Sequence, residues 1–313
     1  MLMNLRFCAF LLLAVGMIVS FQFSAHAKHE DFPRLPGAEL LTGYPGDDLA
    51  ITTPSSTLIL QKGHNSKSVL PSMSRDGGII AASQWRRDIS RSIFTLALAT
   101  YSVPDKQWRE YATLEYFGFL AISPDGSKMA YATAKPDAPG GVRIFVIDLK
   151  TGRETASPVI GHHESIGMSW SPDGSRIAFG MSQSPFAAPD RPVIKILEVE
   201  TGRTSTVAEG QMPAWSPSGE WIAYLDPEDR PNRVLMVHPD GSGGKTLVTL
   251  GGDRIFHHAA PIVWSPDSAR LLLNEIDNPD TYTFKIHLFD LATLKLKTKF
   301  KNTVPVYGWT ELK

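Results

Sequence analysis

The chain has 313 residues, of which 42% are hydrophobic and 20% charged, proportions that suit a globular core and exclude a chain that is disordered throughout. Its formal net charge of −1 excludes nonspecific binding of nucleic acid or an anionic membrane through a basic excess. The single cysteine excludes a framework of intrachain disulfides.

The first 27 residues have the pattern of an export signal. Arg6 precedes an apolar run over residues 7–19, and the segment ends in Ser24-Ala25-His26-Ala27, a small-x-small cleavage pattern. The apolar run is shorter than most membrane-spanning helices. The sequence therefore predicts a signal peptide over residues 1–27, which removes the only cysteine when it is cleaved.

A repeated turn motif organises the rest of the chain. Ser-Pro-Asp-Gly is complete after residues 122 and 170 and altered in three other copies, which begin at Ser74, Ser216 and Ser265. The five serines are separated by 49, 48, 45 and 49 residues. Serine at the first corner, proline at the second and glycine at the fourth favour a type I turn.

The pattern of each repeat predicts one blade of a propeller. The turn motif lies between two short apolar runs, and a third run ends in a Thr-Gly turn, as at residues 151–152 and 201–202. Four antiparallel strands in about 40–50 residues is the size of a propeller blade. A tryptophan holds the same repeat position in several units and predicts core between blades; these are Trp170, Trp215, Trp264 and Trp309.

The repeats predict an all-β fold, a six-bladed β-propeller, with seven blades as the alternative. Five units run from Ser74 to Thr310, and residues 28–73 supply about one more. We expect the strand at residues 304–309 to pair with N-terminal strands in one shared blade, because that closure removes open sheet edges. The predicted organisation is a signal peptide over 1–27, an N-terminal linker over 28–45 and a single propeller domain over 46–313.

These units resemble the WD40-like (PD40) repeats of the TolB family of propellers. The resemblance rests on residues 170–179, 215–224 and 264–273 together with the Thr-Gly turns, and it covers roughly residues 55–311. It implies the TolB-like propeller fold. TolB itself carries an additional N-terminal α/β domain, whereas the residues before Ser74 are needed here for the sixth blade, so we expect a stand-alone propeller.

One face of the propeller is predicted to bind partners. The loops that enter the innermost strands, and those between the second and third strands, emerge on the same face, and several are long: residues 85–92, 135–141, 183–191, 227–232 and 277–282. Long loops on a rigid scaffold often carry binding residues. The candidates for this partner-binding face are Trp85, Arg86, Arg87, Arg91, His162, His163, Gln211, His257 and His258.

The favoured function is a non-enzymatic, exported scaffold of the cell envelope, periplasmic or secreted. It would bind another envelope or secreted protein, or a glycan or peptide, as a monomer without a cofactor. We expect no nucleic-acid partner and no transmembrane span after signal cleavage. No Gly-x-Ser-x-Gly elbow supplies a hydrolase nucleophile, and no catalytic residues are assigned.

The alternative is a metal-dependent lyase or hydrolase that acts on an acidic sugar. Imidazole and amide side chains that converge at the channel mouth suit a divalent transition metal. The candidate ligands are His162, His163, Gln211, His257 and His258. Oligogalacturonate lyases, which are propellers of similar make-up with a His/Gln metal site, make this the sharpest enzyme hypothesis.

Overall fold

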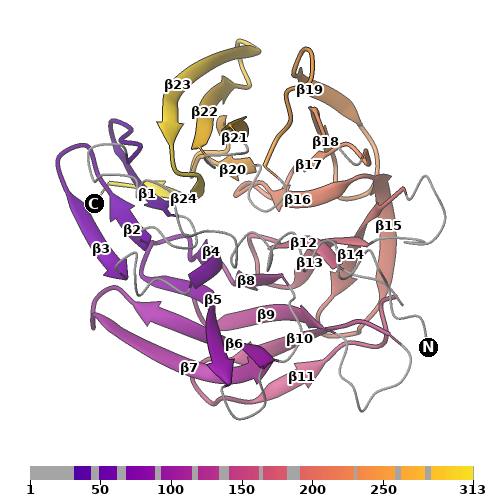
Figure 1. The fold of residues 1–313 in the computed structure, drawn as a ribbon. Helices are drawn as coiled ribbons and strands as arrows, with labels where there is room; N and C mark the ends of the chain where they lie inside the picture. Colours follow the sequence, from indigo (N-terminus) through magenta and orange to yellow (C-terminus); the bar gives the residue numbers. More distant parts are fainter. Residues whose placement is uncertain are drawn as a thin grey trace.

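The computed structural model describes residues 32–43, 49–61, 68–88, 93–114, 119–133, 141–161, 165–181, 191–228, 231–257, 262–278 and 283–312. Within these ranges the chain forms β-strands and no helix. The strands make six four-stranded antiparallel sheets, which Figure 1 shows as blades around a central axis. The prediction of an all-β, six-bladed propeller is confirmed.

The strands of each blade are given from the innermost outward. Blade 1 contains β24 (Val306–Glu311), β1 (Ala38–Thr42), β2 (Leu49–Thr52) and β3 (Thr57–Gln61); blade 2 contains β4 (Ser68–Met73), β5 (Ile79–Asp88), β6 (Ile93–Ser102) and β7 (Gln107–Leu114); blade 3 contains β8 (Leu120–Ile122), β9 (Lys128–Thr133), β10 (Arg143–Asp148) and β11 (Glu154–Ala156). Blade 4 contains β12 (Ser165–Trp170), β13 (Arg176–Met181), β14 (Val193–Glu198) and β15 (Thr204–Glu209); blade 5 contains β16 (Gln211–Trp215), β17 (Ile222–Leu225), β18 (Arg233–Val237) and β19 (Lys245–Thr249); blade 6 contains β20 (Ile262–Trp264), β21 (Arg270–Asn278), β22 (Thr283–Asp290) and β23 (Lys295–Thr303).

The ring closes through the C-terminal strand. Contacts between inner strands run from β24 through β4, β8, β12, β16 and β20 back to β24. β24 pairs antiparallel with β1, so that Leu40 lies opposite Trp309. This is the shared blade predicted from residues 304–309. β1 lies within the segment assigned to the linker, and its fully buried Leu40 and Leu41 show that the propeller core begins before residue 46.

Side chains tie the closing strand to both neighbouring blades. The fully buried Asn274 of β21 donates from Nδ2 to the Val306 carbonyl at 2.8 Å, and its Oδ1 accepts from the Val306 N–H at 3.0 Å. On the other side, the Thr310 hydroxyl donates to the Arg75 carbonyl of blade 2 at 2.8 Å. β24 is therefore held by main-chain pairing in blade 1 and by hydrogen bonds to blades 6 and 2.

The Ser-Pro-Asp-Gly turns have the predicted geometry. The Gly126 N–H donates to the Ser123 carbonyl at 2.9 Å, and the φ of +70° at Gly126 requires a residue that tolerates the left-handed region. The Ser123 hydroxyl donates to Asp125 at 2.6 Å and accepts from the Lys128 N–H at 2.9 Å. This network joins the two strands that flank the turn, and it recurs at Ser74, Ser171 and Ser265.

The turns also bond to one another across blades. The Arg75 N–H donates to the Pro124 carbonyl of blade 3 at 2.9 Å, and the Ser218 N–H of blade 5 donates to the Ser268 hydroxyl of blade 6 at 2.8 Å. The Arg75 guanidinium reaches the Pro217 carbonyl of blade 5, three blades further round the ring. The face that carries these turns, called the turn face below, is therefore braced by its own polar groups.

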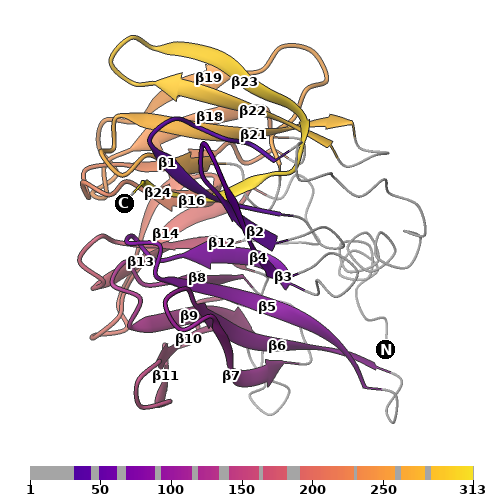
Figure 2. The same cartoon turned by 90° about the vertical axis from the view of Figure 1, so that its left-hand side faces the viewer.

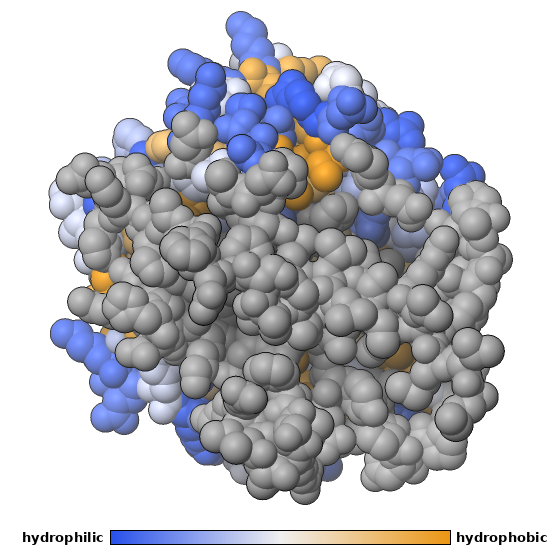
Figure 3. Space-filling view, in the orientation of Figure 1, coloured by the Kyte–Doolittle hydropathy of each residue, from blue (hydrophilic) through white to orange (hydrophobic). Residues whose placement is uncertain are grey.

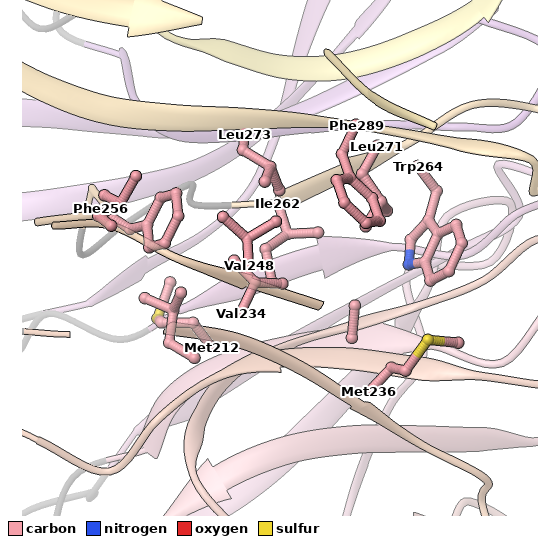
Figure 4. Packing of buried hydrophobic residues seen from close by; sticks show 13 residues of the cluster. Met212, Val234, Met236, Val248, Phe256, Ile262, Trp264, Leu271, Leu273 and Phe289 are labelled. Carbon is pink, nitrogen blue, oxygen red and sulfur yellow. The ribbon is translucent and has the colours of Figure 1, made fainter. Parts of the chain in front are cut away.

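The repeated tryptophans pack between blades, as predicted. Trp170, Trp215 and Trp264 are 5%, 5% and 6% exposed, and Trp309 is half-buried. The Trp264 indole donates to the Ala214 carbonyl of blade 5 at 2.9 Å, and Figure 4 shows its ring near Leu271, Phe289 and Met236. A cation from the preceding blade covers two of these rings, because Arg176 lies over Trp215 and Arg270 over Trp309.

Candidate functional site

Two hairpins extend further than the other described strands on the face opposite the turn face. β5 and β6 are ten residues each and stay paired up to Asp88 opposite Ile93. β21 and β22 stay paired up to Asn278 opposite Thr283. Figure 2 shows both hairpins extending on the same side of the ring. We call this side the hairpin face; its two long hairpins belong to blades 2 and 6, which flank blade 1.

The hairpin in blade 2 corrects the predicted loop at residues 85–92. Trp85, Arg86 and Arg87 lie in β5, opposite Leu96, Thr95 and Phe94 of β6. The β-branched and aromatic residues of β6 favour strand pairing at these positions. The three candidates therefore stand at fixed register positions on a hairpin rather than on an irregular loop. Arg91 lies outside the described residues.

Gln211 is a structural side chain at the start of β16. Its Nε2 donates to the carbonyls of Asp226 at 3.1 Å and Glu228 at 2.9 Å, so it fixes the chain that leaves β17. The Asp226 carboxylate, 1% exposed, accepts from Arg233 Nε at 3.1 Å and from its N–H at 3.2 Å. Gln211 and Asp226 thus anchor the edge of blade 5 on the hairpin face.

His257 is the other described member of the predicted metal set. It is 7% exposed, its N–H donates to the Asn274 carbonyl at 2.8 Å, and its ring meets the Phe284 ring edge-on at 4.9 Å between centroids. His162, His163 and His258 lie outside the described residues. Within the described part of the chain, no three His, Cys, Asp or Glu residues group in a way that could hold a metal ion.

Blade 6 contains a buried ionic network that was not predicted from the sequence. Arg254, from the connection between β19 and β20, donates from Nε and Nη2 to the two carboxylate oxygens of Glu275 at 2.8 and 2.5 Å. His287 Nε2 lies 2.6 Å from Glu275 Oε2, and His287 Nδ1 lies 3.0 Å from the Thr298 hydroxyl. The four residues come from separate segments, so no local sequence pattern signals them.

The network holds Glu275 as a carboxylate. The side chains of Glu275 and His287 are both 1% exposed, whereas that of Arg254 is 47% exposed. Burial raises the pKa of Glu275, but the hydrogen bonds from His287 and Arg254 outweigh burial and lower this pKa to about 2. The arrangement therefore fixes the half-exposed Arg254 side chain beside Glu275 of β21, where its guanidinium could contact an anionic or carbonyl group.

Comparisons with known proteins identify the fold. A scan against protein-family models finds no match. TolB from Acinetobacter baumannii superposes with a TM-score of 0.64 at 14% identity, covering 88% of this chain and 66% of that one. Putative TolB from Agrobacterium tumefaciens gives 0.58 at 16% identity, covering 81% and 88%. The chain has the TolB-like propeller fold.

This TolB-like propeller also resembles proteins that are not named TolB. Dipeptidyl-peptidase 5 of Porphyromonas gingivalis is 27% identical over 198 residues, which cover 58% of this chain and 26% of that protein. The chain thus spans about a quarter of the length of that relative. An oligogalacturonate lyase in complex with manganese superposes with a TM-score of 0.53 at 15% identity, covering 84% of this chain and 72% of that one. The described residues of the TolB-like propeller contain no helix of the length and hydropathy needed to cross a membrane.

Proposed function

We propose that this protein is an exported, non-enzymatic propeller of the periplasm or exterior, which binds another envelope or secreted protein on its hairpin face. The observation that carries the proposal is the difference between the two faces. On the turn face, Ser, Asp and backbone groups satisfy one another within and between blades. On the hairpin face, two blades extend paired strands outward.

The hairpin in blade 2 supplies the candidate anchor. Trp85, Arg86 and Arg87 follow one another in β5 near the tip of the hairpin. Tryptophan and arginine are enriched among the residues that contribute most to protein–protein affinity. A paired hairpin also holds such residues at fixed positions before the partner arrives, which lowers the ordering cost of binding.

The test compares three forms of the full chain in capture experiments from envelope extract. We expect Trp85→Ala/Arg87→Glu to lose the proteins that the wild type captures. Lys150→Glu, in the exposed Thr-Gly turn of blade 3, is the matched control on the opposite face and should capture the same set as the wild type. Thermal unfolding of each variant checks that the fold is intact. Identical partner sets for all three proteins would reject the hairpin as the contact.

A metal-dependent lyase or hydrolase acting on an acidic sugar is the competing function, and the manganese-bound lyase that shares the fold motivates its test. Metal analysis of the purified protein, and its thermal midpoint with added Mn²⁺, Zn²⁺ or Ni²⁺, separate the two functions. Bound metal that is lost in His257→Ala would favour the enzyme. If no metal is bound and none of the three ions raises the thermal midpoint, the metal-dependent lyase or hydrolase is eliminated.

A further inference from the structure

The outer edge of blade 6 carries an unusual concentration of positive charge. β23 is nine residues long, and Lys295, Lys297, Lys299 and Lys301 on it are all exposed. In the described part of the chain none of these lysines forms a salt bridge. The other outer strands, β3, β7, β11, β15 and β19, contain at most one lysine or arginine each. The charge is therefore a property of this edge and not of the blade repeat.

Exposed leucines accompany the lysines. Leu294 is 67% exposed, the highest value among the exposed large hydrophobic residues of the described chain, and Leu296 is 38% exposed. Figure 3 shows hydrophilic and hydrophobic residues side by side on the part of the rim where Figure 1 places β22 and β23. Apolar side chains beside charged ones at a surface are typical of an interaction site.

Leu294 also occupies a backbone position that disfavours leucine. Its φ is +54°, and the equivalent turns of blades 3 and 4 have Gly152 at +73° and Gly202 at +71°. The left-handed region is costly for a residue with a side chain, and an exposed leucine gains little packing in return. Glycine would suit the fold better, so the leucine side chain is better explained by a contact outside this chain.

The backbone of β23 is open on its outer side. β23 is the last strand of its sheet, and residues 295–298 pair with β22 without a break, with Lys295 opposite Asp290 and Lys297 opposite Leu288. The register shifts only beyond that segment. Alternate side chains of a strand lie on one face and repeat about every 6.8 Å. Alternate residues of an added strand would repeat at the same interval.

We propose that β23 binds an extended acidic peptide segment of a partner protein, which adds to blade 6 as a fifth strand with Asp or Glu at alternate positions. Main-chain hydrogen bonds to the open edge would give affinity, and cross-strand pairs with Lys295 and Lys297 would give selectivity. Leu294 and Leu296 would contact apolar residues of the same segment. This surface lies at the outer rim and does not depend on the hairpin face.

The lysines disfavour another copy of this chain as the occupant. Two β23 edges paired together would place lysine near lysine, and like charges across strands are destabilising. Lysine on an edge strand also blocks indiscriminate strand addition. An acidic polysaccharide would meet the charges but has no backbone N–H and C=O groups that repeat at the spacing of a β-strand, so an acidic peptide uses more of this edge.

The test measures binding of a fluorescent nine-residue peptide of alternating glutamate and threonine to the full chain by fluorescence anisotropy. We expect saturable binding that Lys295→Glu/Lys297→Glu weakens by about tenfold or more. Leu294→Gly should weaken binding while raising the thermal midpoint. Lys106→Gly is the matched control, because Lys106 has a φ of +56° in the turn before the outer strand of blade 2. It should raise the midpoint without changing binding.

Three further probes separate main-chain pairing from charge alone. A peptide with its threonines replaced by proline keeps the charges but loses main-chain donors, and it should bind much more weakly. Equal binding of the proline peptide, of polygalacturonate or of phosphatidylglycerol vesicles would replace the proposal with simple polyanion attraction. No binding of the alternating peptide, or unchanged binding after charge reversal, would overturn it. Trp85→Ala/Arg87→Glu should bind the alternating peptide as the wild type does, whether or not it loses the partners of the hairpin face.

Discussion

Replacement of Asn274 by alanine tests how the ring is closed. The Asn274 side chain is fully buried and bonds to both the N–H and the carbonyl of Val306 in β24. Alanine leaves these two buried main-chain groups without that partner, and each such group costs about 1–3 kcal/mol. Because one water can enter the vacated space and satisfy part of the loss, we expect Asn274→Ala to lower the free energy of unfolding by about 2–4 kcal/mol.

Urea denaturation at neutral pH measures this loss, and hydrogen exchange localises it. Thr310→Val is the control on the same strand, because it removes only the bond from the Thr310 hydroxyl to the Arg75 carbonyl and should cost about 1 kcal/mol. In Asn274→Ala the amides of β24 and β1 should exchange faster relative to those of blade 4. A loss no larger than that of Thr310→Val, with unchanged exchange in β24, would refute the view that Asn274 holds the closing strand.

Two further predictions concern the core and the buried ions. Trp264→Ala should lower the free energy of unfolding by about 3–5 kcal/mol, because it removes a 6%-exposed indole packed between blades 5 and 6. Leu312→Ala, at a 45%-exposed site, is the control and should leave the thermal midpoint nearly unchanged. An equally unchanged midpoint in Trp264→Ala would contradict the blade assignment. The pKa of Glu275 is lowered from 4.5 to about 2 on folding, so its stabilisation of about 3 kcal/mol is present above pH 4.5 and is lost as the pH falls towards 2. Glu275→Gln should therefore be less stable than the wild type at pH 7, and the difference should shrink between pH 4.5 and 2; a constant difference across that range would show that the charge of Glu275 does not matter.

The fold was predictable because the signals that specify it are local and repeated. Each Ser-Pro-Asp-Gly copy fixes a turn between the first two strands of one blade, so its five positions mark five of the six blades. Trp264 and its equivalents mark inner strands because only the space between blades accommodates an indole at that position. β1 was missed because the segment from Ala38 to Thr42 carries no turn motif and is recognisable only through its pairing with β24.

The candidate site was less predictable because its groups are brought together by tertiary structure. Residues 85–92 are predicted as a loop, because the pairing of Trp85 with Leu96 and of Arg87 with Phe94 is established only in the folded blade. Gln211 is predicted as a candidate metal ligand, and only the fold shows that its amide nitrogen donates to two backbone carbonyls. The network around Glu275 depends on four segments that meet only in the folded blade.

Two residues replace the glycine of a repeated turn, and they differ in whether the fold compensates for the backbone strain. Ser268 replaces glycine in its turn and has a φ of +59°, but its hydroxyl accepts a hydrogen bond from the Ser218 N–H of the preceding blade at 2.8 Å. That bond gives a structural reason for the serine. Leu294 makes the same kind of replacement in a Thr-Gly turn, yet its side chain is 67% exposed and lies beside four exposed lysines. The first departure stabilises the ring, whereas the second costs stability, so the second is the better guide to where a partner binds.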